Sequence, residues 1–359
     1  MPAVLDPTPM FSPSPLPRNL EASFRDLTSE KPPTRVSAIH DVVRHALRGD
    51  ATRERAIPLL ERALKDDAAP GVRAAAAVAL ADIGARDALS SLLVAVEDVD
   101  PHVRQMALSS LGELGDPRAT QRLERALRDV RPEVRYQAVI AFSRVAKDDP
   151  PAVASALAHA LDDDDEAIRY IAMRLAEEFQ TDGEPLRDAR LLARAEKLVA
   201  EDCDDAAVVA ALYLARLGRE PGRKVVIDVV AEARRTPELE DEQACVELSG
   251  DLLLRDAIPH LERRAWGSRR VVRAFLSWGA GDRRSCAWHA RIALARMGHE
   301  RARAEILDDL GSWRRETREA AVVAAGRARI REARGKLENL GGTVDAALVH
   351  EALVRLAVD

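Results

Sequence analysis

Aromatic residues are scarce in this chain, at 3 % of its 359 positions. Runs that alternate Val, Ile, Tyr or Thr with polar residues, which favour β-strands, are also missing. The apolar residues, 47 % of the chain, are mostly Ala, Leu and Val, which suit closely packed helices. With 32 % charged residues, this composition predicts a folded all-α protein and argues against a mainly disordered chain.

The chain also has few cysteines, no long apolar run and no net positive charge. The three cysteines, Cys203, Cys245 and Cys286, are odd in number and far apart, which favours thiols in a reducing cytoplasm over a disulfide framework. No apolar run approaches the roughly 20 residues of a membrane span, and the N-terminus lacks the basic start of a secretory signal. The net charge of −6 argues against a general nucleic-acid coat. We therefore expect a cytoplasmic protein.

A short recurring motif gives the strongest signal. Pro70, Pro101 and Pro132 each open a Pro-x-Val-Arg unit, and these units are 31 residues apart. A fourth copy has Glu166 in place of proline. Repeats of this length indicate a helical solenoid, because a helix pair of about 30 residues cannot cover its own apolar face and needs the next pair.

The best-defined unit, residues 100–127, indicates where its helices begin and end. Asp100 is the expected N-cap, and Pro101 stands at the first helical position, where no N–H donor is needed. Gly115 is expected to end this helix in the left-handed conformation. Asp116 and the proline after it are expected to begin the next helix.

The second helices of the units are also similar to one another. Residues 257–263 differ from residues 56–62 at one position only. Pro58 and Pro259 are expected in the first turns of their helices, where proline is tolerated. The repeats thus extend through most of the chain and predict an all-α, right-handed α-solenoid of about nine helix pairs.

These units resemble HEAT repeats, in particular the short variety of the phycobilin (PBS) lyases, as found in bacterial HEAT-repeat proteins. The match is closest from Pro70 to Phe179. The resemblance implies that the arginine after the valine of each unit packs against acidic groups near the helix starts of adjacent repeats. It assigns this structural ladder to Arg73, Arg104, Arg135 and Arg169.

The predicted organisation has three parts. Residues 1–18 are rich in proline and are expected to form a disordered tail. Residues 19–33 are expected to hold a short N-terminal capping helix, with Asn19 as its cap, and a linker. Residues 34–359 are expected to form the solenoid, with an irregular, basic, Trp-rich insertion near residues 265–284.

Charge is distributed unevenly along the predicted solenoid. Residues 148–205 are acidic, which fits a solvated ridge with stabilised helix starts. Residues 255–303 carry a local charge of +8 and three of the four tryptophans. Because Trp and Arg are enriched where proteins bind partners, we predict partner binding there. The predicted residues are Trp266, Arg269, Arg270, Arg273, Trp278, Arg283, Arg284, Trp288 and Trp313. Alternatively, the tryptophan rings fill a wider gap left by an irregular repeat.

Motifs that carry known chemistry are absent from the sequence. It has no Gly-rich phosphate loop, G-x-S-x-G elbow or C-x-x-C pair. Deoxyhypusine hydroxylase, a HEAT-type enzyme, holds two irons with four His-Glu motifs. Only two such pairs occur here, at His299 and His350. We therefore expect no catalytic residues, no metal site and no cofactor.

The sequence favours a non-catalytic cytoplasmic scaffold or adaptor that binds one or more protein partners along the repeat surface. Nucleic-acid binding, or the activity of a HEAT-like alkylpurine DNA glycosylase at the basic Trp/Arg segment, stays open as an alternative. A HEAT-type lyase or metal-dependent hydroxylase is a third hypothesis.

Overall fold

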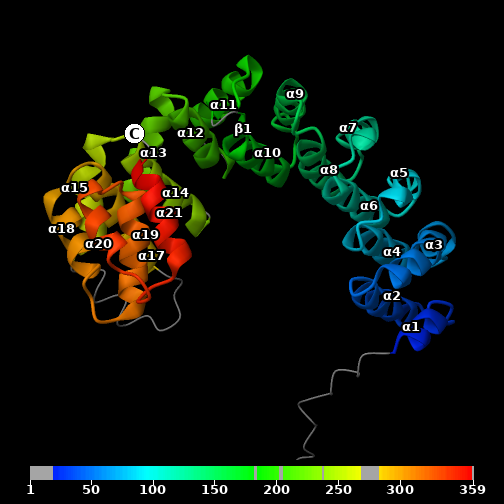
Figure 1. Ribbon diagram of the computed structural model, residues 1–359. Helices are drawn as coiled ribbons and strands as arrows, with labels where there is room; N and C mark the ends of the chain where they lie inside the picture. Colours follow the sequence, from blue (N-terminus) through cyan, green and yellow to red (C-terminus); the bar gives the residue numbers. More distant parts are fainter. Residues whose placement is uncertain (1–18, 182–183, 202–204, 237, 268–282, 358–359) are drawn as a thin grey trace, which may run out of the picture. The chain divides into compact units, whose positions relative to one another are not determined.

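The computed structural model describes residues 19–181, 184–201, 205–236, 238–267 and 283–357 (Figure 1). The chain divides into two compact units, Met1–Ala156 and Leu157–Asp359. Each unit is built from successive helix pairs, in which we call the first helix the leading helix and the other the second helix. Within the described residues, no helix is both long and apolar enough to cross a membrane.

In the first unit the leading helices lie side by side, and the second helices form another layer against them (Figure 1). The leading helices are α2 (Pro32–Ala46), α4 (Pro70–Asp82), α6 (Pro101–Leu114) and α8 (Pro132–Val145). The second helices are α3 (Asp50–Asp66), α5 (Leu89–Ala95) after the 3-10 turn η1 (Arg86–Ala88), and α7 (Thr120–Ala126) after η2 (Pro117–Ala119). Helix α1 (Leu20–Asp26) packs on α2, and α9 (Pro150–Ala160) contains the boundary between the units.

The second unit continues the alternation. Its leading helices are α10 (Glu166–Glu178), α12 (Ala206–Arg216), α14 (Leu239–Asp251), α17 (Arg283–Arg296), α19 (Arg315–Arg327) and α21 (Ala346–Ala357). The second helices are α11 (Ala189–Glu201), α13 (Glu220–Val230), α15 (Ile258–Trp266) after η3 (Arg255–Ala257), α18 (Glu300–Asp309) and α20 (Arg334–Glu338) after η4 (Arg331–Ala333). A short antiparallel pair, β1 (Gln180–Thr181) and β2 (Glu184–Pro185), precedes α11. The predicted all-α solenoid class is confirmed.

The helix ends predicted for residues 100–127 are confirmed. The Asp100 carboxylate caps α6 by accepting the backbone N–H groups of His102 and Val103. Gly115 follows α6 with a φ of 64°, in the left-handed region. The Asp116 carboxylate then caps η2. The ends of this helix pair are therefore fixed by contacts between residues close together in sequence.

The acidic run at residues 162–166 takes part in similar contacts. Asp165 caps α10 by accepting the N–H groups of Ala167 and Ile168. Asp162 pairs with Arg194 of α11 at 2.7 Å. Negative charge at a helix start is stabilised by the free N–H groups and the helix dipole, so this run has a structural use.

One predicted proline position is wrong. The sequence predicts Pro58 in the first turn of its helix, but α3 begins at Asp50 and holds Pro58 in its interior. Residues 50–57 include good helix formers and no glycine, so the helix extends towards the N-terminus as far as Asp50. Pro259 does lie in the first turn of α15, as predicted.

Small residues let successive leading helices come close together. A Cβ atom added to Gly326 of α19 would lie 2.8 Å from the Cα of Ala352 in α21. One added to Gly250 of α14 would lie 2.6 Å from the Cα of Ala293 in α17. Gly112 of α6 faces α8 in the same way, at 3.0 Å. At such distances a side chain would force the backbones apart.

Arginines near the helix starts link neighbouring repeats of the first unit. Nε and Nη2 of Arg73 donate to the two carboxylate oxygens of Asp98 at 2.8 and 2.7 Å. Arg104 donates to Asp129 through the same two nitrogens at 2.9 Å. The remaining nitrogen, Nη1, of each arginine donates to the backbone carbonyl oxygen six residues earlier. Each arginine thus joins the turn before its own helix to the turn of the next repeat.

Other arginines make all or part of this contact, and at two of them, Arg35 and Arg169, the sequence motif is incomplete. Arg35 donates to Asp67 at 2.7 and 2.6 Å, although Thr34 stands at the place of the valine. Arg135 and Arg169 each donate to the carbonyl oxygen six residues earlier, at 2.9 and 2.8 Å. The arginine and the turn geometry, rather than the preceding valine, are therefore the common elements of this contact.

Candidate functional site

The predicted partner-binding residues fall into three groups. Arg269, Arg270, Arg273 and Trp278 lie outside the described residues. Arg283 and Arg284 begin α17, but their side chains lie outside the description. Trp266, Trp288 and Trp313 are described, and among these three rings no direct contact is found. Each tryptophan has a different environment.

Trp266 contributes mainly to packing within the second unit. Its indole N–H donates to Oε2 of Glu305 at 3.0 Å. The guanidinium of Arg301 lies 4.1 Å from the centre of the Trp266 ring, and the ring of His299 lies 5.4 Å away. These partners lie in α18 or directly before it, so Trp266 ties the end of α15 to α18. This environment agrees with the packing interpretation.

Trp288 of α17 packs partly against the core of the second unit. Its ring meets the ring of His289 edge-on, with 5.2 Å between the ring centres. On another side the guanidinium of Arg327 lies 5.9 Å from the Trp288 ring. Trp288 is therefore adjacent to an arginine of α19.

Trp313 lies on the surface and is 83 % exposed. It stands in the turn before α19, where the carbonyl oxygen of Ser312 accepts a hydrogen bond from Arg318 at 2.7 Å. The same hydrogen bond marks the turn before α6, where the corresponding residue is Val99, which is 91 % exposed. This turn position faces solvent in both repeats, so packing does not require the tryptophan ring.

Much of the positive charge counted in the sequence has acidic partners outside residues 255–303. Arg264, 3 % exposed, donates to two backbone carbonyl oxygens at 2.6 Å and pairs with Glu242 of α14. Arg303 of α18 pairs with Glu332 of η4 at 2.6 Å. A charge count confined to residues 255–303 therefore overstates the positive charge available to a nucleic acid.

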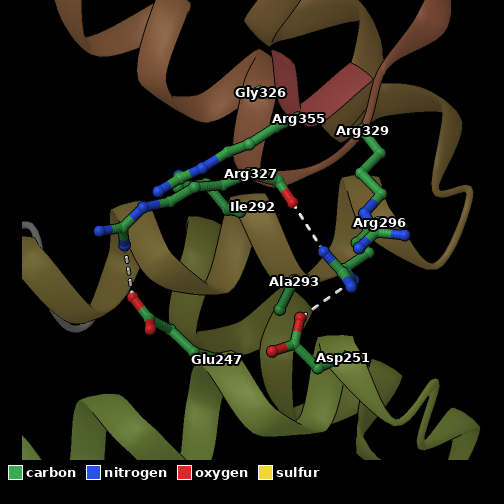
Figure 2. A pocket seen from close by; sticks show the side chains of 9 residues that line it. All are labelled: Glu247, Asp251, Ile292, Ala293, Arg296, Gly326, Arg327, Arg329 and Arg355. Carbon is green, nitrogen blue, oxygen red and sulfur yellow. Dashed lines mark hydrogen bonds and ion pairs between the residues drawn. The ribbon is translucent and has the colours of Figure 1, made fainter. Parts of the chain in front are cut away.

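Four leading helices of the second unit line a cleft of about 460 Å³ (Figure 2). Helices α14, α17, α19 and α21 contribute to it. The lining residues are Glu247, Asp251, Ile292, Ala293, Arg296, Gly326, Arg327, Arg329 and Arg355. Arginines outnumber carboxylates among them, so the cleft is electropositive.

The cleft opens because the helices around it are unevenly spaced. Gly250 allows α14 to pack tightly on α17, and Gly326 allows α19 to pack tightly on α21, whereas α17 and α19 touch at few points. Arg296 spans this looser junction. Its Nε pairs with Oδ1 of Asp251 at 3.0 Å, and its Nη1 donates to the carbonyl oxygen of Arg327 at 2.9 Å (Figure 2).

A second ion pair lies at the other end of the cleft. Nη1 of Arg327 donates to Oε1 of Glu247 at 2.7 Å (Figure 2). The same carboxylate oxygen lies 3.1 Å from Nε2 of His289. Glu247 is thus held between a guanidinium and an imidazole, which fix its position on the cleft wall.

The other two arginines of the cleft have no acidic partner on another described element. Arg329 makes no side-chain hydrogen bond or ion pair with any described residue. Arg355 pairs with Glu351, one turn earlier in α21, at 2.7 Å. Both arginines therefore keep donors that a bound anion could use.

Arg329 also has an unusual backbone conformation. Its φ is 52°, in the left-handed region that glycine favours. Gly84, Gly115 and Gly298 take this conformation one or two residues after α4, α6 and α17, with φ values of 62°, 64° and 87°. Leu253, after α14, is another residue with a side chain here, at 53°. For such residues the conformation costs about 1–2 kcal/mol relative to an ordinary helical one.

The sequence-based prediction missed this cleft. None of Glu247, Asp251, Arg327, Arg329 and Arg355 was among the predicted partner-binding residues. One signal could have drawn attention to it. Aligned on the alanine four residues later, Arg329 takes the place that glycine holds at residues 84 and 115.

The described residues contain no cluster of three or more His, Cys, Asp or Glu side chains suited to holding a metal ion. His299 is engaged in the fold instead, because its Nδ1 accepts the N–H of Ala302 at 3.4 Å and caps α18. Its Nε2 lies 2.9 Å from Oε1 of Glu262. Since Nδ1 accepts a hydrogen bond, a neutral His299 carries its proton on Nε2 and donates it to Glu262.

Comparison with known proteins identifies the repeats. A protein-family model described as HEAT repeats matches the chain twice, over residues 57–143 and 92–177. Residues 57–177 of this chain are therefore HEAT repeats. No curated protein matches it significantly.

Three solved structures illustrate the structural similarity of this HEAT-repeat protein to others. The complex of CpcE and CpcF of phycocyanin lyase from Nostoc sp. PCC7120 has 18 % sequence identity, covers 83 % of this chain and 93 % of that chain, and has a TM-score of 0.37. YibA of E. coli is 15 % identical in sequence, and the match covers 84 % of this chain and 92 % of the YibA chain with a TM-score of 0.38. An engineered protein is 17 % identical in sequence, and the match covers 94 % of this chain and 97 % of the engineered chain with a TM-score of 0.41. None of these similarities bears on what this chain binds.

Proposed function

We propose that this HEAT-repeat protein is a non-catalytic scaffold that binds a protein partner, with Trp313 as an anchor of the contact. The observation that carries the proposal is the 83 % exposure of Trp313 at a turn position that packing between repeats leaves free. Burying a tryptophan side chain removes roughly 150–250 Å² of surface from water, so such a residue gains most when a partner covers it. Trp and Arg are also enriched among residues that dominate binding energy.

Arg314 supports the same assignment. Its guanidinium lies 4.9 Å from the centre of the Trp313 ring, which partly orders both side chains before a partner arrives. Pre-ordered side chains lose less conformational entropy on binding. An aromatic ring beside a guanidinium also offers both apolar contact and hydrogen-bond donors.

The chemistry of the cleft favours binding over catalysis. Its polar groups are guanidinium groups and two ion-paired carboxylates, which suit anion recognition. Among its described lining residues no Ser, Cys or Thr nucleophile stands beside a base. A cytoplasmic location is part of this proposal, and the buried thiols of Cys245 and Cys286, which form no disulfide, are compatible with it.

The proposal can be tested by site-specific photo-cross-linking in the cell of origin. A photoreactive amino acid is placed at position 313 of the full chain, with position 130 as the matched control. Val130 occupies the equivalent turn before α8 and is 84 % exposed. We expect a discrete protein adduct from position 313 that position 130 does not give. The absence of a protein adduct from position 313 would refute Trp313 as the anchor. Its absence together with no binding of an acidic peptide would refute the scaffold, and adducts destroyed by nuclease would favour the nucleic-acid hypothesis.

A further inference from the structure

We propose that the arginine-lined cleft of the second unit binds an acidic segment of the protein partner, through carboxylates of neighbouring Asp or Glu side chains. This inference rests on the scaffold function proposed above and specifies the chemistry of its ligand. Trp313 lies outside the lining of the cleft, so the two contacts can be tested separately.

The distribution of charge in the cleft is the first support. Arg296 and Arg327 each already have a carboxylate partner within the cleft. Arg329 has none among the described residues, and Arg355 has one only on its own helix. The lining therefore holds an excess of two positive charges, which two ligand carboxylates would balance. The planar guanidinium binds a carboxylate through two parallel hydrogen bonds, so acidic side chains match these donors.

The backbone of Arg329 is the second support. Its left-handed conformation is less favourable than it would be for glycine, and no side-chain hydrogen bond or ion pair with a described residue offsets this cost. Strained residues are typical of functional positions, where a side chain is needed despite its conformation. At this position the side chain is a guanidinium that lines the cleft.

The size and lining of the cleft favour a peptide over a nucleic-acid strand. Its volume of about 460 Å³ lies within the range of roughly 300–1,000 Å³ typical of pockets for small ligands. This volume accommodates only a few amino-acid residues. Ile292 and Ala293 supply apolar lining for the methylene groups of Asp or Glu.

The test measures binding of labelled peptides to the full-length protein by fluorescence anisotropy. The acidic probe is a fluorescein-labelled peptide of six alternating Asp and Glu residues. The neutral probe has the same length and alternates Asn and Gln. We expect the protein to bind the acidic probe at least about tenfold more tightly than the neutral one, with a preference that weakens as salt is added.

Two variants locate the binding. Arg329→Gly combined with Arg355→Gln should weaken binding of the acidic probe at least about tenfold. This double variant removes the two guanidinium groups that have no acidic partner on another described element. Leu253→Gly is the matched control, since it relieves the same backbone conformation at the equivalent place without changing the cleft charge. It should leave the affinity unchanged. Circular dichroism checks that both variants remain folded.

Three outcomes would overturn the inference: equal affinity of the wild type and the double variant, no preference for the acidic probe, or tighter binding of inorganic phosphate than of the peptide at the same arginines. The cross-link at position 313 is an independent readout. Its absence while the acidic peptide still binds would refute the proposed anchor alone. Its presence without peptide binding would refute only the cleft assignment.

Discussion

The ion pair between Arg73 and Asp98 allows a quantitative test of how neighbouring repeats are joined. Asp98 accepts hydrogen bonds from Arg73 at 2.8 and 2.7 Å and from the N–H of Asp100 at 2.9 Å. Both side chains of the pair are mostly buried, with 12 % of Arg73 and 14 % of Asp98 exposed. The substitution Asp98→Ala removes the carboxylate and leaves the guanidinium without this partner.

The size of the effect follows from this partial burial. A hydrogen bond to a charged group contributes about 1.5–3 kcal/mol, and breaking a fully buried ion pair costs about 3–5 kcal/mol. Because water still reaches both side chains, we expect Asp98→Ala to lower the free energy of unfolding of the first unit by about 2–3 kcal/mol.

The preceding residue provides a matched control. Glu97 pairs with Arg122, but 61 % of Glu97 and 35 % of Arg122 are exposed. Exposed ion pairs contribute roughly 0–1 kcal/mol, so Glu97→Ala should have little effect. Both variants alter an acid in the same turn, and they differ chiefly in burial.

The assay is urea unfolding followed by circular dichroism, with amide hydrogen exchange to show which repeats open first. The double substitution Arg73→Ala with Asp98→Ala measures the coupling within the pair. If Asp98→Ala and Glu97→Ala differ by less than about 0.5 kcal/mol, the arginine contacts do not hold the repeats together as argued.

The same contacts determine how the stability of the first unit depends on pH. Partial burial opposes ionisation of Asp98, but the hydrogen bonds from Arg73 and from the Asp100 N–H outweigh it, so its pKa lies below the usual value. The pKa values of Asp67 and Asp129 are lowered by the same balance of causes. A carboxyl group with a lowered folded-state pKa contributes stability that is present above its unfolded pKa of about 3.9 and is lost as the pH falls through the folded value.

Three further predictions concern other parts of the fold. The urea midpoint of the first unit should fall as the pH drops below about 4, and an unchanged midpoint between pH 5 and pH 3 would contradict the role of the three carboxylates. Gly326→Ala should lower the unfolding free energy by about 1–3 kcal/mol, because the added methyl group meets the backbone of α21. Gly335→Ala in α20 should raise it by about 0.5–1 kcal/mol, because the space around Gly335 is open. Denaturant titration should therefore give changes of opposite sign for the two variants. Tyr213→Phe should lower the unfolding free energy by about 1–2 kcal/mol in the same titration. The buried Tyr213 hydroxyl donates to the carbonyl oxygen of Leu186 at 2.6 Å, and the substitution leaves that oxygen without this donor.

The fold could be predicted because each repeat determines its own helix ends through local contacts. The cap at Asp100 and the left-handed turn at Gly115 each involve only a few neighbouring residues. Pro58 shows where this reasoning fails. The letters around it are almost the same as those around Pro259, but the residues upstream continue the helix in one case and not in the other. Local similarity therefore predicts the kind of element better than where it begins.

The cleft could not be predicted in the same way, because it depends on the spacing between helices. The lining residues extend from Glu247 to Arg355, and nothing local to either residue indicates that α17 and α19 make few contacts with each other. Counting charged residues along the sequence also fails to show which charges are neutralised by partners elsewhere in the fold. A window of residues 255–303 contains Arg303 but not Glu332, which pairs with it. Sequence proximity is a poor guide to electrostatics when successive repeats exchange partners.

Two positions of the repeat unit can change without loss of the contacts that hold the repeats together. One is the exposed residue of the turn before a leading helix, which is Val99 in one repeat and Trp313 in another, while the arginine contact to the preceding carbonyl is kept. The other is the left-handed residue in the turn after a leading helix, which is Gly115 in one repeat and Arg329 in another. At the second position, a residue other than glycine costs about 1–2 kcal/mol because its backbone is left-handed. At the first position, the side chain faces solvent, so packing imposes no such cost. Stacked repeats can therefore gain aromatic or basic surface groups one at a time, while the core between helices stays the same.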